Sequence, residues 1–255
     1  MSAIHPTAAK GFANGADTYV RGRPDFPPAA LAWLREDLGL QPGKTVIDLG
    51  AGTGKFTRLL VETGATVTAV DPVAAMLDRL VRDLPGVTAL PGDAQRIPLP
   101  DACADAVICA QAFHWFANAE SLAEIRRVLK PGGLLGLIWN VRDQSVDWVR
   151  RLTAIMDPYE GEAPRYDDGE WRAAFPAPGF GDLREKSFPH VHTGTPETVI
   201  VDRVASVSFI AALDEPVRAR VLAEIRALID ATPGLASRSS ISFPYVTRAW
   251  WCQAI

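Results

Sequence analysis

The stretch Val46-Ile47-Asp48-Leu49-Gly50-Ala51-Gly52-Thr53-Gly54-Lys55-Phe56-Thr57 decides the fold of this chain. A short apolar run stops at an aspartate, three glycines follow at alternate positions, and a segment with helical character comes next. Buried strand, glycine turn and helix start together form the first unit of a nucleotide-binding α/β domain. Because glycines lack a side chain and adopt positive φ at little cost, such a turn exposes backbone N–H groups to a ligand at the helix N-terminus.

Two common glycine motifs differ from this one. A phosphate-binding P-loop has four residues between its glycines, followed by Lys and Ser or Thr. Here three residues separate Gly50 from Gly54, and Phe56 follows Lys55, which excludes the P-loop. The dinucleotide fingerprint is G-x-G-x-x-G, whereas this chain has G-x-G-x-G. The early third glycine disfavours a nicotinamide-dependent oxidoreductase, which stays an alternative.

Beyond the glycine turn, short apolar strands alternate with helices. Residues 66–70 predict a second strand that ends at Asp71, about 20 residues past the turn, where an acid can accept hydrogen bonds from two ribose hydroxyls. Pro72 suits the first turn of the helix that follows. Residues 87–90 predict a third strand, and Asp93 beyond it is placed to accept a hydrogen bond from an exocyclic amine.

The remaining elements follow from the same periodicity. A fourth strand at 106–110 and a fifth at 134–139 enclose a helix that ends at Lys130. Past residue 140 the pattern predicts short helices at 147–158 and 168–175, a strand at 183–192, helices in two pieces over 196–232, and a final strand at 240–254.

Five segments occur in a characteristic order, namely Val46–Thr57, Ala69–Pro72, Gly92–Ala94, Ile108–Phe116 and Leu129–Gly133. Together they resemble class I S-adenosylmethionine-dependent methyltransferases, most of all the small-molecule group that includes ubiquinone and trans-aconitate methylating enzymes. The resemblance implies an α/β fold with a doubly wound, seven-stranded, mostly parallel sheet of Rossmann-like type. It also implies an N-terminal helical segment, 1–40, that covers the cofactor, and a methyltransferase domain, 41–255, with a helical cap at about 196–235 between the last two strands.

The resemblance assigns S-adenosyl-L-methionine as the cofactor and gives roles to the matching positions. Asp48 would lie near the ammonium group, Asp71 would hold the ribose, and Asp93 would face the adenine amino group. The methionine part would lie against Gly50, Gly52, Gly54 and Gln111. The other positions assigned to the cofactor are Ala51, Pro72, Met76, Ala94 and Gln95.

Near the N-terminus, Tyr19 and Arg23 stand in the spacing Tyr-x-x-x-Arg-Pro. In similar enzymes this segment folds over the cofactor, so the resemblance implies that Tyr19 or Arg23 contacts the methionine carboxylate or an acidic acceptor. A frayed and solvated terminus is the alternative.

Methyl transfer from a sulfonium mainly needs alignment of the reactants and exclusion of water, and a general base is optional. His114 is the candidate catalytic base, because it lies in residues 111–116 just beyond the fourth strand. A structural histidine among three aromatic residues is the alternative. We expect transfer to a small molecule at an oxygen such as a carboxylate, with carbon and nitrogen acceptors open. A regulatory protein that binds the cofactor without catalysis is a further alternative.

The amino-acid composition limits the kinds of binding partner that we expect. The 255 residues include 26 basic and 30 acidic side chains, and the net charge of −4 disfavours nucleic acid as a partner. No apolar run reaches about 18 residues and the N-terminus lacks a signal-peptide core, so no membrane span is expected. Three cysteines without a close motif fit a reducing cytoplasm. His190 and His192 alternate without a third ligand at motif spacing, so no metal is expected. No pattern specifies an oligomeric state.

Overall fold

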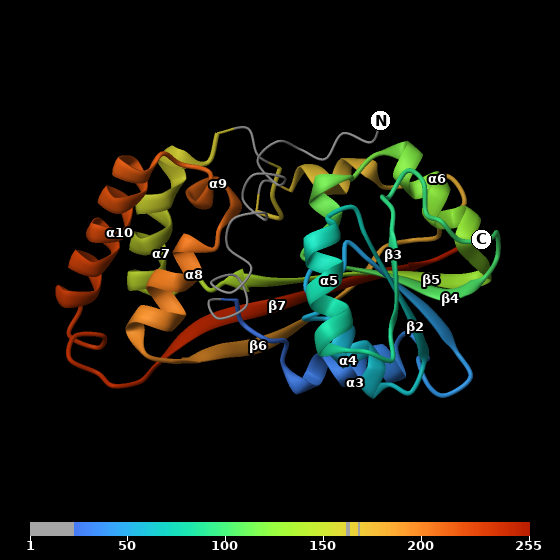
Figure 1. The fold of residues 1–255 in the computed structure, drawn as a ribbon, viewed down its shortest axis with the longest axis horizontal. Helices are drawn as coiled ribbons and strands as arrows, with labels where there is room; N and C mark the ends of the chain where they lie inside the picture. The colour runs from blue at the N-terminus through green and yellow to red at the C-terminus, as the bar shows by residue number, and fades with distance from the viewer. Residues whose placement is uncertain (1–22, 162–163, 168) are drawn as a thin grey trace.

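A computed structural model describes residues 23–161, 164–167 and 169–255. Its centre is a seven-stranded sheet with the strand order β3-β2-β1-β4-β5-β7-β6 (Figure 1). The strands are β1 Thr45–Leu49, β2 Thr66–Asp71, β3 Thr88–Pro91, β4 Ala104–Ala110, β5 Leu129–Arg142, β6 Arg184–Gly194 and β7 Ile241–Gln253. Strand β7 runs antiparallel to both β5 and β6, and the other pairs are parallel. The predicted doubly wound, mostly parallel α/β sheet is confirmed.

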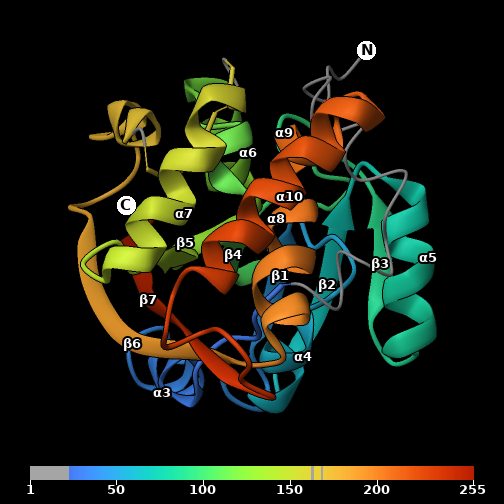
Figure 2. The same ribbon diagram turned by 90° about the vertical axis from the view of Figure 1, so that its left-hand side faces the viewer.

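Helices cover both faces of this sheet, and further helices lie beyond one end of it (Figures 1 and 2). The α-helices are α3 Pro28–Glu36, α4 Thr57–Glu62, α5 Ala74–Asp83, α6 Ala119–Val128, α7 Asp147–Met156, α8 Arg203–Ala205, α9 Ser208–Ala211 and α10 Glu215–Asp230. Shorter helical turns are η1 Phe113–Trp115, η2 Asp157–Tyr159, η3 Glu170–Ala174 and the π-helical η4 Glu197–Asp202. In both views α7 and α10 lie side by side at the end of the molecule where α8 and α9 also gather (Figures 1 and 2).

Side chains alternate across the strands and therefore divide the apolar residues among separate cores. The neighbours Trp250 and Trp251 of β7 illustrate this division. Trp250 packs with the α6 side of the sheet, together with the buried Trp139 and Trp171. Trp251 packs with the side covered by α3, α4 and α5, where its ring lies edge-on to that of Trp33. A third apolar core joins α7, η4 and α8 to α10.

Two element boundaries differ from the sequence prediction. Helix α5 begins at Ala74 rather than at Pro72, because the Asp71 carboxylate accepts the Val73 N–H at 2.8 Å and keeps Val73 extended. The helix expected to end at Lys130 ends at Val128, because Leu129 already pairs with Ala104 before the register of β5 shifts. By contrast, the β-branched run 199–204 is helical, as its periodicity predicted.

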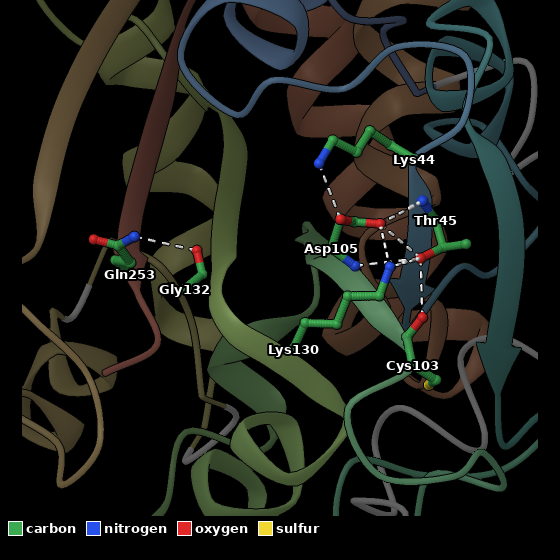
Figure 3. A network of polar contacts seen from close by, with 7 residues as sticks. All are labelled: Lys44, Thr45, Cys103, Asp105, Lys130, Gly132 and Gln253. Atoms are coloured by element: carbon green, nitrogen blue, oxygen red, sulfur yellow. Dashed lines mark hydrogen bonds and ion pairs between the residues drawn. The ribbon is translucent and has the colours of Figure 1, made fainter.

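A polar network joins the strands at the amino ends of β1 and β4 (Figure 3). The Asp105 carboxylate accepts the Thr45 N–H at 2.9 Å, Lys44 Nζ at 3.1 Å and Lys130 Nζ at 2.7 Å. Partial burial raises the pKa of Asp105, but these hydrogen bonds outweigh burial and hold the pKa well below its usual range. The network therefore fixes β4 against β1 at the edge of the sheet opposite to the strand ends that carry Asp71 and Gln111.

Candidate functional site

The carboxyl ends of the parallel strands border a cavity of about 290 Å³. Ligands in open α/β sheets bind at this edge, where the strand order reverses. The residues expected to bind the cofactor that line the cavity are Arg23, Asp48, Gly50, Ala51, Gly52, Asp71, Pro72, Met76, Asp93, Ala94, Gln95 and Gln111. Gly54 and His114 do not line it, and Tyr19 lies outside the described residues.

Asp71 organises the glycine turn from the end of β2. Its Oδ2 accepts the Gly52 N–H at 2.8 Å and its Oδ1 accepts the Val73 N–H at 2.8 Å. Burial raises the pKa of this carboxyl, and the two backbone donors oppose the rise. The side chain thus fixes the loops after β1 and β2 relative to each other while it borders the cavity.

Asp48 is the fully buried acid of the site. Its Oδ2 accepts the Thr57 hydroxyl at 2.6 Å, whereas its Oδ1 has no hydrogen-bond partner among the described residues. Burial raises the pKa of Asp48 to about 7, Thr57 lowers it, and the nearby Asp71 raises it further. A buried carboxylate oxygen without a donor fits a cationic ligand group in the cavity, because a positive charge would restore the ionised form.

The three glycines of the turn have different environments. A Cβ on Gly50 would lie 2.6 Å from the Cβ of Ala112, so that position must stay bare. A Cβ on Gly52, which has a φ of +56°, would meet no atom of the described residues within 4 Å and would enter the open space of the cavity. Gly54 instead packs against α5, where a Cβ would lie 2.8 Å from Cγ of Leu80. Gly54 does not line the cavity, and its contact with the methionine part stays a prediction.

Asp93 lies on the far wall of the cavity, beyond β3. Its Oδ1 accepts the backbone N–H groups of Gln95 at 2.8 Å and Arg96 at 3.0 Å, which closes a tight turn. Gln95 itself is exposed and donates through Nε2 to Glu120 at 3.0 Å. Asp93 therefore shapes this wall through its own turn, with Ala94 buried beside it.

Gln111 follows β4 in the left-handed region, with a φ of +57°. Backbone strain of this kind in a residue other than glycine is typical of functional sites. Its N–H donates to the Ile138 carbonyl at 2.8 Å, and its Nε2 donates to the Asn140 carbonyl at 3.4 Å. These bonds to β5 hold the side chain of Gln111 where it borders two cavities.

The segment from Arg23 to Phe26 forms one side of the first cavity. Arg23 Nη2 donates to the Ser206 carbonyl at 3.0 Å, and Asn140 Nδ2 donates to the Asp25 carbonyl at 3.0 Å. Lys55 donates to the Arg23 carbonyl and pairs with Asp25 at 3.2 Å. Sequence reasoning did not assign Lys55 to the site, although its place directly after the glycine turn was the available signal.

A second cavity of about 120 Å³ adjoins the first and shares Arg23, Gln111 and Trp115 with it. His114 lines this second cavity, and the indole Nε1 of Trp139 donates to His114 Nδ1 at 3.1 Å. Burial, with the charges of Arg23 and Arg165, lowers the pKa of His114 to about 3. Of the other aromatic residues in this segment, Trp115 and Phe116 line the first cavity, whereas Phe113 is fully buried in the core.

The described residues were also compared with what a membrane-spanning helix and a metal site require. Within 23–161, 164–167 and 169–255, no helix has both the length and the apolar character needed to cross a bilayer. In the same residues, no three His, Cys or acidic side chains gather in a way that could hold a metal ion. His190 and His192 lie on β6 with half-buried rings.

Comparisons with known proteins agree with this geometry. Residues 47–137 match the family model described as a methyltransferase domain. An uncharacterised methyltransferase of Mycobacterium tuberculosis is 42% identical over 236 residues, which cover 92% of each chain. An uncharacterised methyltransferase-like protein of Schizosaccharomyces pombe is 38% identical over 242 residues, which cover 94% of each chain.

A solved structure is similar over nearly the whole chain. It is a candidate type II methyltransferase from Anaeromyxobacter dehalogenans, with a TM-score of 0.62 and 26% identity, and the match covers 91% of this chain and 97% of that chain. The chain belongs to the methyltransferase family, and its cofactor is S-adenosylmethionine.

Proposed function

We propose that this protein methylates a carboxylate oxygen of a small molecule that binds in the second cavity. The observation that carries the proposal is the contact between the two cavities, which share Arg23, Gln111 and Trp115. A donor in the first cavity and an acceptor in the second would both lie against these side chains. The arginines around the second cavity favour a negatively charged acceptor.

The chemistry asks little of the protein beyond position. S-adenosylmethionine supplies a methyl group that its sulfonium already activates. The acceptor oxygen forms a bond to the methyl carbon while the carbon–sulfur bond breaks, which gives an ester and S-adenosylhomocysteine. Because a carboxylate is already ionised at neutral pH, no proton has to leave, and the side chains need only align the acceptor and exclude water.

The placement of the acids around the first cavity supports the cofactor-binding roles that the resemblance implies. In this proposal Asp48 faces the ammonium group, Asp71 holds the ribose hydroxyls and Asp93 faces the adenine. The unpartnered Oδ1 of Asp48 supports the first role, and the open space at Gly52 lets the ligand approach the backbone.

The N-terminal segment, 1–40, is proposed to cover the cofactor. Its support is the position of Arg23 and Phe26 on the wall of the first cavity. Hydrogen bonds from Lys55 and Asn140, and one from Arg23 to the Ser206 carbonyl, hold residues 23–25 there. Deletion of residues 1–25 should then weaken S-adenosylmethionine binding. Unchanged affinity in calorimetry would remove the covering role.

Calorimetry tests the cofactor site directly. We expect S-adenosylmethionine and S-adenosylhomocysteine to bind the wild-type protein and NAD not to bind. Asp71→Ala should weaken both ligands by about tenfold to a hundredfold, because two backbone donors and the ribose lose their acceptor. Asp78→Ala, on the exposed side of α5, is the matched control and should bind like the wild type.

A metabolite screen then tests catalysis. Formation of S-adenosylhomocysteine should depend on added carboxylic acids, and the product should carry one methyl ester by mass spectrometry. Cofactor binding without turnover on any acid would favour a regulatory protein. Turnover that places the methyl group on nitrogen or carbon would overturn the oxygen assignment.

A further inference from the structure

Besides Arg23, three guanidinium groups reach the second cavity from different parts of the chain. Arg142 ends β5, Arg165 lies between η2 and η3, and Arg203 begins α8. The sequence separates these residues widely, and only the packing of α8 and the 164–167 segment near β5 brings them to one cavity. The inference drawn for this cavity rests on the proposed methyl transfer.

Arg142 has an unusual partner for a charged group. Its Nη1 donates to the Met156 Sδ at 2.9 Å, and a thioether is only a weak acceptor. Burial lowers the pKa of Arg142, Arg203 lowers it next, Asp167 and Tyr245 raise it, and Arg165 lowers it again. The positive charges of Arg203 and Arg165 are therefore close enough to act on Arg142.

Arg203 has hydrogen-bond donors that the described part of the chain does not use. Its Nε and Nη1 are buried and have no hydrogen-bond partner among the described residues. Buried donors without acceptors cost free energy, and they cost more when the group is charged. Native structures satisfy most buried polar groups, so donors left without an acceptor beside a cavity point to an acceptor that lies in the cavity.

Acidic side chains around the cavity compensate only part of this charge. Among the residues that the structure describes, Asp167 is the acid that lines the cavity with the arginines, and it is exposed. Glu160 forms an ion pair with Arg165. Arg142 and Arg203 have no carboxylate partner in the described residues, and the guanidinium group binds carboxylates and phosphates in bidentate fashion.

A carboxylate held by guanidinium groups is a poor nucleophile, because the lone pairs needed for attack accept the hydrogen bonds. The group that receives the methyl should therefore be a different one, nearer to Gln111 and Trp115 where the two cavities meet. We propose that the acceptor carries at least two anionic groups, of which Arg142 and Arg203 bind the one that is not methylated. The reacting group is then a second, carboxylate group of the same molecule, and its oxygen takes the methyl as described above.

Matched small acids test this specificity in protein saturated with S-adenosylhomocysteine. Glutarate carries two carboxylates, 3-phosphonopropionate carries a carboxylate and a phosphonate, and valerate and glutaramide are the monoanionic and neutral controls. We expect glutarate or 3-phosphonopropionate to bind at least about tenfold more tightly than valerate in calorimetry, with affinity that falls as salt rises. The comparison of the two dianions shows whether the held group is a carboxylate or a phosphate.

Variants then identify the arginines responsible. Arg203→Met and Arg142→Met should weaken dianion binding by about tenfold or more and leave S-adenosylhomocysteine binding unchanged, because neither side chain lines the first cavity. Arg220→Met, on the exposed face of α10, is the matched control and should bind dianions like the wild type. Should Arg142→Met lose stability, Arg203→Met decides alone.

The outcomes separate this inference from the proposed function. Absence of S-adenosylhomocysteine binding to the wild type would remove the proposed function itself. Normal S-adenosylhomocysteine binding with no preference for the dianions, or a preference that survives Arg203→Met, would overturn the two-anion acceptor and leave methyl transfer standing. Methylation of valerate as efficiently as glutarate would overturn it in the same way.

Discussion

The indole N–H of Trp139 donates a hydrogen bond to Nδ1 of His114 at 3.1 Å. Since indole nitrogen can only donate, Nδ1 must present its lone pair, and the neutral imidazole then carries its proton on Nε2. With its pKa lowered to about 3 by burial and by the charges of Arg23 and Arg165, His114 is neutral at physiological pH. This arrangement favours a hydrogen-bond donor at the second cavity over the general base expected from the sequence.

The pH dependence of kcat distinguishes the two roles of His114. We expect kcat to show no inflection from a histidine between about pH 5 and pH 8, because the ring stays neutral over that range. His114→Gln keeps a donor and should retain kcat within about tenfold, whereas His114→Phe should lose more. An inflection near neutral pH that disappears in His114→Gln would restore the general base.

Asp48 should release a proton when S-adenosylmethionine binds. Its folded pKa of about 7 lies above the usual value, and a cationic ligand beside it would lower that pKa again. Affinity should therefore rise with pH up to about 7 and level off above it. Calorimetry in buffers of different ionisation enthalpy measures the number of protons released on binding. Asp48→Asn should bind S-adenosylmethionine without releasing a proton. Equal heats in all buffers below pH 7 would contradict this assignment.

Gly52 and Gly54 form a matched pair for separating ligand contact from packing. Both have positive φ, so alanine at either position should cost about 1–2 kcal/mol of folding free energy. Gly54→Ala should cost about 1–3 kcal/mol more, because its Cβ would overlap Leu80. Gly52→Ala should instead lose more cofactor affinity than Gly54→Ala. Urea unfolding and calorimetry on both variants check this, and a reversed order would place the ligand elsewhere.

Asp105 should matter for stability and not for the cofactor. Its folded pKa is depressed, so its stabilisation is present above the unfolded value of about 3.8 and is lost as the pH falls below that value. Asp105→Asn should lower the free energy of unfolding by about 1–3 kcal/mol at neutral pH. It should also flatten the acid limb of the stability curve. Cofactor affinity should stay unchanged, since Asp105 lies at the amino end of β4 (Figure 3) and the first cavity lies at the carboxyl ends of the strands.

The residues that line the first cavity could be predicted from the sequence, because each lies close in the chain to a predicted strand or turn. Asp48, Gly52 and Asp71 each follow or end a predicted strand, and parallel strands bring such ends to one edge of a sheet. The environment of Gly54 was not predictable in this way. Its packing partner Leu80 belongs to another helix, and only the docking of α5 shows that the two meet.

The sequence by itself determined the strand–turn–helix units, their order and the acids at the strand ends, because periodicity and turn chemistry act over short distances. Only the tertiary structure decided the second cavity. It brings Arg142, Arg165 and Arg203 together across widely separated segments, and it turns Nδ1 of His114 toward Trp139. Burial and neighbouring charges set the ionisation of His114 and Asp48, and both arise only when distant parts of the chain pack.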